Sequence, residues 1–142
     1  MNASHSVPDG FTPIFMVEPF TTMIGPIYSK PDGAHLLRLG FRVAQEHLNI
    51  ERVVHGGMLS TVADQAIGMN VAHANNQTND VLTMHLSVDF ISPAVLGEWV
   101  EASVSLSKVS GRVRFGNCEL HVGDRLVLKA SAIFAARVHK GR

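Results

Sequence analysis

The chain has a single cysteine among its 142 residues, and this scarcity limits its chemistry. Cys118 has no second cysteine with which to form an internal disulfide, so a reducing compartment fits best and we expect a cytoplasmic protein. The apolar runs are short and interrupted, which excludes a transmembrane helix. The first ten residues are polar and lack the basic-then-apolar pattern of a secretory signal.

The chain also has no net charge, because 12 Lys and Arg residues balance 12 Asp and Glu residues. With no excess of positive charge and no helix-turn-helix pattern, we expect neither a nucleic-acid nor a membrane partner. The balance is uneven along the chain, however. Eight of the 12 basic residues lie at or after Lys108, where only Glu119 and Asp124 oppose them. This local positive charge either binds phosphates or forms an ordinary solvated strand face.

Several catalytic motifs are absent too. No Gly-x-Ser-x-Gly segment occurs, which argues against the nucleophile elbow of an α/β-hydrolase. Apart from His55, the histidines show no paired spacing typical of a metal site, so no metal is expected. Cys118 lies within a predicted strand without a partner pattern, so a nucleophilic thiol is not expected.

The periodicity that is present predicts one α+β domain. Residues 1–27, rich in Pro, Gly and Phe, predict a lead-in segment with one or two helical turns, and residues 28–142 predict the main domain. A weak alternation over residues 34–44 predicts a strand, and residues 45–54 are typical of a loop. A long apolar helix is predicted over about 56–73, followed by turn formers at 75–79.

After this helix the apolar period changes to two. An alternating strand is predicted first, with these apolar positions: Leu82, Met84, Leu86, Val88 and Phe90. Further strands are predicted over 99–109, 113–122 and 126–138, joined by hairpin turns at Ser110-Gly111 and Gly123-Asp124. One apolar helix followed by four antiparallel strands predicts a curved sheet around the helix.

The most informative segment is the helix that starts at His55-Gly56-Gly57, because it contains one acid among apolar residues. Asp64 lies two turns into it, where a carboxylate is costly to desolvate unless another group uses or pairs it. The two glycines let a second group approach the backbone and leave N–H donors free at the helix start. An acid and an anion-binding helix start on one element indicate two parts of a hydrolytic site. A structural ion pair is the alternative role for Asp64.

Further motifs surround this segment. Asn49 precedes His55 by six residues, and Asp64 follows His55 by nine. The others are Thr83, Ser87-Val88-Asp89, Ser92-Pro93-Ala94 with Gly97-Glu98, and Ser110-Gly111-Arg112. From about residue 20 to 136 the chain therefore resembles the hotdog-fold acyl-CoA thioesterases, in the phenylacetyl-CoA thioesterase and Them2-like branch. The resemblance implies a hotdog fold, with a curved antiparallel β-sheet around a long central helix, and hydrolysis of an acyl-CoA to free acid and coenzyme A.

The resemblance also implies catalytic roles. The Gly56 N–H would stabilise the developing oxyanion, Asn49 would help to hold the thioester, and His55 would orient the turn. Asp64 would act as general base toward water, or as nucleophile through an anhydride, and Thr83 would help to position the attacking water. Each residue also has a structural interpretation. Asn49 would be a turn residue, His55 a helix-start residue without ligand contact, Thr83 an ordinary strand residue, and the glycines a means of starting the helix against a strand.

Coenzyme A is part of the substrate in this scheme, so no separate cofactor is expected. Its phosphates would lie near the Ser110-Gly111 turn, and Arg112 is the first choice among the cations there because its forked donors suit phosphate. The full set of predicted substrate-binding residues is Gly57, Lys108, Ser110, Gly111, Arg112 and Arg114. The apolar residues that would line an acyl pocket, or else be plain core, are Phe11, Phe15, Phe20, Met23, Met58 and Met69.

Spacing along the helix adds a prediction about assembly. Gly56 and Asp64 are eight residues apart, which is about 12 Å along an α-helix. One carbonyl carbon cannot lie within about 3 Å of both groups. If both act on one thioester they come from different chains, so we expect a homodimer with two symmetric interface sites. The resemblance implies that such dimers often pair into tetramers.

Two other functions are compatible with the same fold. A hotdog hydratase or dehydratase acts on enoyl or hydroxyacyl thioesters, but its Gly-His-Phe-Pro-like stretch is absent here. A non-catalytic acyl-CoA-binding module would keep the basic turn and would have no use for Asp64.

Overall fold

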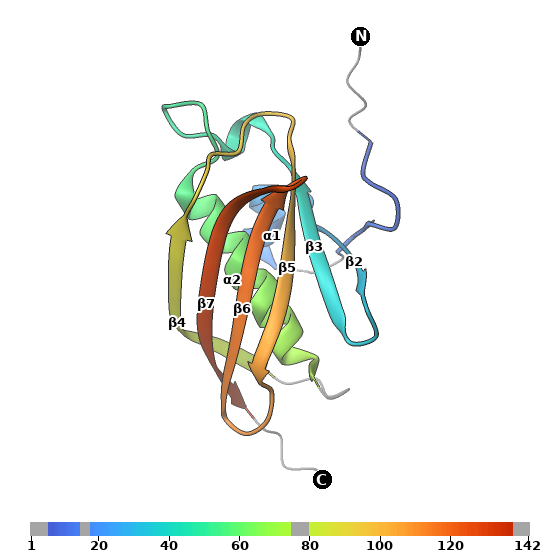
Figure 1. The fold of residues 1–142 in the computed structure, drawn as a ribbon, viewed down its shortest axis with the longest axis vertical. Coiled ribbons are helices and arrows are strands. Elements are labelled where there is room, and N and C mark those ends of the chain that lie inside the picture. Colours follow the sequence, from blue (N-terminus) through green and yellow to red (C-terminus); the bar gives the residue numbers. More distant parts are fainter. Residues whose placement is uncertain (1–5, 15–17, 75–79, 138–142) are drawn as a thin grey trace.

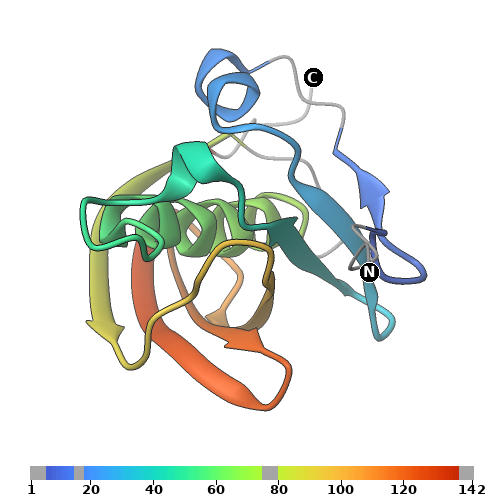
Figure 2. The ribbon, with the colours of Figure 1, turned by 90° about the horizontal axis from the view of Figure 1, so that it is seen from above.

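The computed structural model describes residues 6–14, 18–74 and 80–137. Its elements are β1 (Thr12–Pro13), α1 (Pro19–Ile24), β2 (Tyr28–Asp32), β3 (Leu36–Arg42), the 3₁₀ turn η1 (Gln45–His47), α2 (Gly56–Ala72), β4 (Asp80–Phe90), β5 (Trp99–Lys108), β6 (Val113–Val122) and β7 (Arg125–Arg137). The strands form one seven-stranded antiparallel sheet in the order β1-β2-β3-β5-β6-β7-β4. The sheet curves around α2, which lies inside the curve (Figures 1 and 2). The predicted architecture is confirmed.

The helix lies close to the sheet because glycines remove side chains at the contact. A Cβ added to Gly68 of α2 would lie 3.1 Å from the Phe134 ring of β7, and one added to Gly116 of β6 would lie 2.7 Å from Ile67. Ile67, Val62 and Ala66 of α2 are fully buried in the core that this approach creates. Burial of these side chains, rather than helix propensity, is the main stabilisation of α2.

Strand β4 departs from its predicted alternation. Its pairing with β7 shifts register between Thr83 and His85, which is a β-bulge. Leu82 and Met84 are consequently 73% and 62% exposed, although the alternation assigned them to the core face. The residues of β4 that pack against the core are Val81, Leu86 and Val88. The prediction for β4 was therefore right about where the strand lies in the sequence and wrong about which of its side chains face the core.

The N-terminal region contributes more than the short helix that was predicted. α1 supplies that helix, but β1 and β2 also extend the sheet beyond β3. β2 escaped prediction because its sequence Tyr-Ser-Lys-Pro-Asp has few strand-forming residues. Pro31 is tolerated because β1 pairs with β2 only at Tyr28 and Ser29, so Pro31 lies where β2 is an open edge.

The predicted helix boundaries agree with α2, which ends at Ala72 with His73 as its C-cap. The turn formers expected at 75–79 lie outside the described residues, as does Phe15. Within the described residues, no helix is long and apolar enough to cross a membrane.

Candidate active site

The start of α2 leaves one backbone donor unpaired. His55 is the N-cap residue, and its Nδ1 accepts a 2.8 Å hydrogen bond from the Gly57 N–H. The N–H groups of Met58 and Leu59 donate to the His55 carbonyl at 2.9 and 3.2 Å. Among the residues that the structure describes, none accepts a hydrogen bond from the Gly56 N–H. Gly56 thus presents a free donor at the positive end of the helix dipole.

Phe90, at the end of β4, covers Gly56. A Cβ added to Gly56 would lie 3.2 Å from the Phe90 ring, and Phe90 remains 57% exposed despite this contact. A Cβ at this position would make a tight contact with the ring, so glycine eases the approach of Phe90 to the helix start. Phe90 was predicted only as a core residue of its strand, and its place beside the free N–H makes it a site residue that the sequence analysis missed.

Asp64 faces Thr83 across the space between α2 and β4. The Thr83 hydroxyl donates a 2.7 Å hydrogen bond to Asp64 Oδ1, which leaves Oδ2 available to another group. Asp64 is half-buried rather than enclosed, so the apolar composition of α2 overstated its burial. Among the described residues, no basic side chain pairs with Asp64, so the ion-pair interpretation has no support there.

A groove of two neighbouring cavities follows α2. The helix-start cavity, of about 550 Å³, borders His55 and Gly57, and the Asp64 cavity, of about 500 Å³, contains Asp64 and Thr83. Both cavities are lined by Phe20 of α1 and by Thr61 of α2, so α1 forms one wall of the whole groove.

The sequence analysis left open whether a set of apolar residues lines a pocket or belongs to the core, and the described members of this set divide between the two. Phe20, Met23 and Met58 line the helix-start cavity, and Met69 lines the Asp64 cavity. Phe11 is core, with its ring 5.1 Å from that of Trp99 in an edge-on arrangement.

Asn49 lies outside this groove in the isolated chain. Its Oδ1 accepts hydrogen bonds from the N–H groups of Glu51 and Val53 at 2.9 and 3.3 Å, as in an Asx turn. It lines a separate hollow beside Ile50 and Leu96. The structure therefore shows the turn role of Asn49, and its contact with a thioester stays a prediction.

The basic turn between β5 and β6 divides into exposed and buried parts. Lys108, Ser110, Gly111 and Arg112 are exposed, and Gly111 has a φ of +77°, which favours glycine. Arg114 is only 3% exposed, and its guanidinium donates to the carbonyls of Val71 and Gly111. Arg114 is thus occupied within the fold at the C-terminal end of α2, and Lys108 and Arg112 are the cations exposed at this turn.

The remaining positive charge of the C-terminal region does not form one patch. Arg125 pairs with Glu98 at 2.7 Å, and Lys129 lies on the outer face of the sheet. Lys140 and Arg142 lie outside the described residues.

Cys118 is buried against the helix side of the sheet. Burial raises the pKa of its thiol to about 12, with a smaller contribution from the Glu119 charge. A thiol that remains protonated at neutral pH is a poor nucleophile, in agreement with the prediction. Within the described part of the chain, no group of His, Cys, Asp and Glu side chains is arranged to hold a metal ion.

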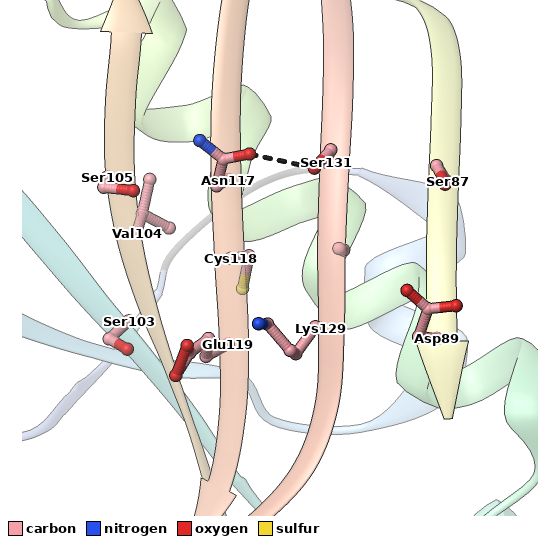
Figure 3. Close-up of a pocket in the computed structure, with 11 residues that line it drawn as sticks. Ser87, Asp89, Ser103, Val104, Ser105, Asn117, Cys118, Glu119, Lys129 and Ser131 are labelled. Carbon is pink, nitrogen blue, oxygen red and sulfur yellow. Dashed lines mark hydrogen bonds between the residues drawn. The ribbon is translucent and has the colours of Figure 1, made fainter. Parts of the chain in front are cut away.

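Another hollow, of about 620 Å³, lies on the face of the sheet away from α2 (Figure 3). Its polar lining comes from four strands: Ser87, Asp89, Ser103, Ser105, Asn117, Glu119, Lys129 and Ser131. Ser131 donates a 2.9 Å hydrogen bond to Asn117 Oδ1 across β6 and β7. Although this hollow is larger than the groove cavities, it contains none of the predicted site residues, whereas Asp64 and Thr83 line the groove.

Comparison with known proteins finds a matching family and several similar proteins. A family model described as "Thioesterase superfamily" matches residues 51–129, the segment from just before α2 into β7. A Pseudomonas aeruginosa protein named "Putative esterase PA0474" is 34% identical over 129 residues, covering 91% of this chain and 96% of its own.

Two further similarities bear on coenzyme A. An acyl-coenzyme A thioesterase of Xenopus laevis, THEM4, is 30% identical over 82 residues, which are 56% of this chain and 36% of that protein. A crystal structure from Streptococcus pneumoniae, described as a hypothetical thioesterase protein with coenzyme A, superposes with a TM-score of 0.71 at 17% identity. That match covers 81% of this chain and 91% of the other, and at this identity it supports the fold alone.

Proposed function

The chain belongs to the thioesterase superfamily, and from that premise we propose that it hydrolyses the thioester bond of an acyl-CoA at a site shared by two subunits. Thioester hydrolysis follows from the family. The shared site rests on the geometry of α2, and the acyl-CoA substrate rests on the exposed cations of the β5–β6 turn and on similar proteins. The proposal rests on two features of α2. The Gly56 N–H has no hydrogen-bond acceptor among the described residues, and the Asp64 carboxylate, which Thr83 holds, lies in an open groove.

The two groups supply complementary parts of the reaction. Attack on a thioester carbonyl places negative charge on its oxygen, and a fixed N–H at a helix start stabilises that charge without reorganisation. Asp64 would either take a proton from the attacking water or attack the carbonyl itself to form an anhydride that water then hydrolyses. In both routes the carbon–sulfur bond breaks and the coenzyme A thiolate leaves and takes up a proton. The hydrogen bond from Thr83 fixes one carboxylate oxygen and directs the other.

A second subunit is required if both groups act on one carbonyl. Gly56 and Asp64 both belong to α2, eight residues or about 12 Å apart along its axis. A twofold axis that places two such helices side by side and antiparallel would bring Gly56 of one protomer near the partner's Asp64. The exposed surface supports a partner, because large apolar side chains are exposed on and after edge strand β4: Leu82, Met84, Phe90 and Ile91.

Support for coenzyme A comes from the exposed cations of the β5–β6 turn and from one sequence relative, and a protein that shares the fold is described with coenzyme A. Lys108 and Arg112 remain available to phosphate groups. THEM4 is named as an acyl-coenzyme A thioesterase, and the Streptococcus pneumoniae structure contains coenzyme A.

The test is thiol release from a panel of acyl-CoA thioesters, monitored with a chromogenic disulfide. The single cysteine of the chain is buried, so we expect it not to react with the reagent. We expect wild type to release thiol and Asp64→Asn to lose on the order of 100-fold in kcat, because the amide can neither accept a proton from water nor attack. Asp124→Asn, at the exposed β6–β7 turn, is the matched control and should retain full activity.

Equal rates for wild type and Asp64→Asn would defeat the proposal. Binding of coenzyme A with no hydrolysis of any thioester in the panel would instead support a non-catalytic acyl-CoA-binding module.

A further inference from the structure

His47 is a buried polar residue in the wall of the helix-start cavity. Its side chain is 6% exposed and lies in η1, between the end of β3 and the loop that leads to α2. It lines the helix-start cavity together with Ile24 and Met23 of α1 and with His55 at the start of α2. Neither the sequence motifs nor the proposed chemistry assigns it a role.

Both ring nitrogens of His47 are used. Nδ1 accepts a 2.9 Å hydrogen bond from the Ala44 N–H, and Nε2 lies 2.6 Å from the Ile24 carbonyl oxygen. A backbone N–H can only donate and a carbonyl can only accept, so the ring carries its proton on Nε2 and donates to Ile24. The ring also packs edge-on against Phe41, with centroids 5.2 Å apart. His47 therefore fastens the C-terminal end of α1 to the body of the protein.

The backbone of the same residue reaches the catalytic turn. The His47 carbonyl accepts a 2.8 Å hydrogen bond from the N–H of His55, the N-cap residue of α2. His47 thus contacts both sides of the helix-start cavity: α1 through its side chain and the turn with the free Gly56 N–H through its backbone. The separation of these two walls depends on its position.

α1 itself has few other attachments. With six residues it is too short to be a stable helix without tertiary contacts. Near its start, buried Thr21 accepts a 3.2 Å hydrogen bond from Gln65 Nε2 and donates one of 3.0 Å to Glu18. Its groove-facing residues Phe20 and Met23 are largely exposed, whereas Ile24 packs partly against the core, so the packing of Ile24 and the polar contacts at the two ends hold this wall in place.

We propose that His47 is a positioning residue for acyl-group selection. A thioester whose carbonyl lies at the Gly56 N–H directs its acyl group into the adjoining helix-start cavity of about 550 Å³, which has the apolar side chains of α1 on one side. By fixing α1 relative to Gly56, His47 sets how much apolar surface an acyl chain contacts. This inference rests on the proposed function, because it concerns the acyl group of the same substrate.

Two substitutions separate the two ring contacts. In His47→Asn the side-chain oxygen can take the place of Nδ1 and accept from Ala44, but no donor reaches Ile24. In His47→Gln the longer amide can take the place of Nε2 and donate to Ile24, but the acceptor for Ala44 is lost. Each variant therefore loses one hydrogen bond of the ring, and only His47→Asn loses the one that holds α1.

The experiment compares octanoyl-CoA, whose chain would reach α1, with acetyl-CoA, whose chain would not. For His47→Asn we expect KM for octanoyl-CoA to rise about five-fold, because one hydrogen bond that holds α1 is lost. The kcat for octanoyl-CoA, and both kcat and KM for acetyl-CoA, should change little. His47→Gln should keep the octanoyl-to-acetyl ratio of kcat/KM. Hydrogen exchange of the α1 amides should accelerate in His47→Asn and not in His47→Gln.

An unchanged octanoyl-to-acetyl ratio in His47→Asn, or the same change in both variants, would overturn the proposal. If wild type hydrolyses no thioester of the panel, the proposed function fails. The inference is then judged by calorimetric binding of the S-octyl thioether of coenzyme A relative to coenzyme A itself. Should His47→Asn not fold, the near-isosteric Thr21→Val loosens α1 from its other end and should shift the same ratio in the same direction.

Discussion

The Thr83 hydroxyl reaches Asp64 Oδ1 at 2.7 Å because a bulge in β4 turns Thr83 toward α2. Without the register shift between Thr83 and His85, the side that carries Leu86 and Val88 would also carry Leu82, and Thr83 would face away from the helix. The bulge thus places a hydroxyl in the groove and exposes Leu82 and Met84 on the edge strand. A single backbone irregularity connects the candidate site with the surface proposed to meet a second subunit.

We expect Thr83→Val to lower kcat about ten-fold and to leave KM nearly unchanged. The near-isosteric side chain keeps the strand packing but removes the hydrogen bond that orients the Asp64 carboxylate. Thr83→Ser keeps the hydroxyl and should retain most activity. Steady-state thiol release checks both variants, and a Thr83→Val enzyme as fast as wild type would remove Thr83 from the site.

The Gly56 N–H can be deleted without removing a helix residue. Gly56 is the first residue of α2, where proline is well tolerated, and His55 has a ψ of 136°, which suits a residue before proline. We expect Gly56→Pro to lose about 100-fold to 1,000-fold in kcat, as for loss of an oxyanion donor.

Gly56→Ala is the matched control for this prediction. It adds the same Cβ beside the Phe90 ring but keeps the N–H, so any cost of that contact appears in both variants. Gly56→Ala should therefore be much more active than Gly56→Pro when both are assayed for kcat. Equal losses would assign the effect to crowding by Phe90 and not to the missing donor.

The fold was predictable from periodicity where each element has one apolar pattern. α2 and strands β5, β6 and β7 were located to within a few residues because burial on the helix or on one sheet face repeats along the chain. The β4 bulge was not predicted because Leu82 and Met84 continue the alternation of Leu86 and Val88, and this sequence pattern does not reveal an extra residue in the strand.

Residues whose roles depend on distant partners were harder to predict. Arg114 was predicted to bind phosphate from its place near a basic turn, but it contacts the Val71 carbonyl 43 residues earlier in the chain. Likewise, nothing local indicates that Phe90 lies over Gly56 or that His47 joins α1 to α2. Asp64 and Gly56 were predictable as candidates because an acid and a glycine turn are unusual on one apolar helix. Their catalytic roles stay predictions.

Arg114→Met should destabilise the protein by about 1–3 kcal/mol, because the substitution removes the hydrogen bonds that the buried guanidinium donates to the carbonyls of Val71 and Gly111. The free energy of unfolding from urea titration measures this loss. Arg112→Met, on the same turn but exposed, is the control and should leave the unfolding free energy nearly unchanged. Comparable losses in the two variants would contradict the structural role of Arg114.

Lys108 and Arg112 should act on the nucleotide end of the substrate. We expect Lys108→Ala and Arg112→Ala each to raise KM for an acyl-CoA several-fold with kcat nearly unchanged, and the difference from wild type should shrink as salt screens the phosphates. The corresponding acyl-pantetheine thioester lacks the nucleotide, so its KM should not respond to either substitution. A rise in KM for both substrates would indicate that these residues support the fold of the turn instead.

Two inactive variants should restore activity when they share a dimer. A heterodimer of Gly56→Pro and Asp64→Asn subunits contains one site with an intact Gly56 from one protomer and an intact Asp64 from its partner, while its second site carries both defects. Random pairing makes half of the dimers heterodimers, so co-refolded mixtures should recover about one quarter of the wild-type kcat per subunit pair. The control replaces the Gly56→Pro subunit with a Gly56→Pro, Asp64→Asn double variant, which leaves no intact pair. Two copies of α2 side by side can complement each other in this way, whereas one helix with its groups about 12 Å apart cannot. A mixture no more active than its components would therefore show that each protomer works alone.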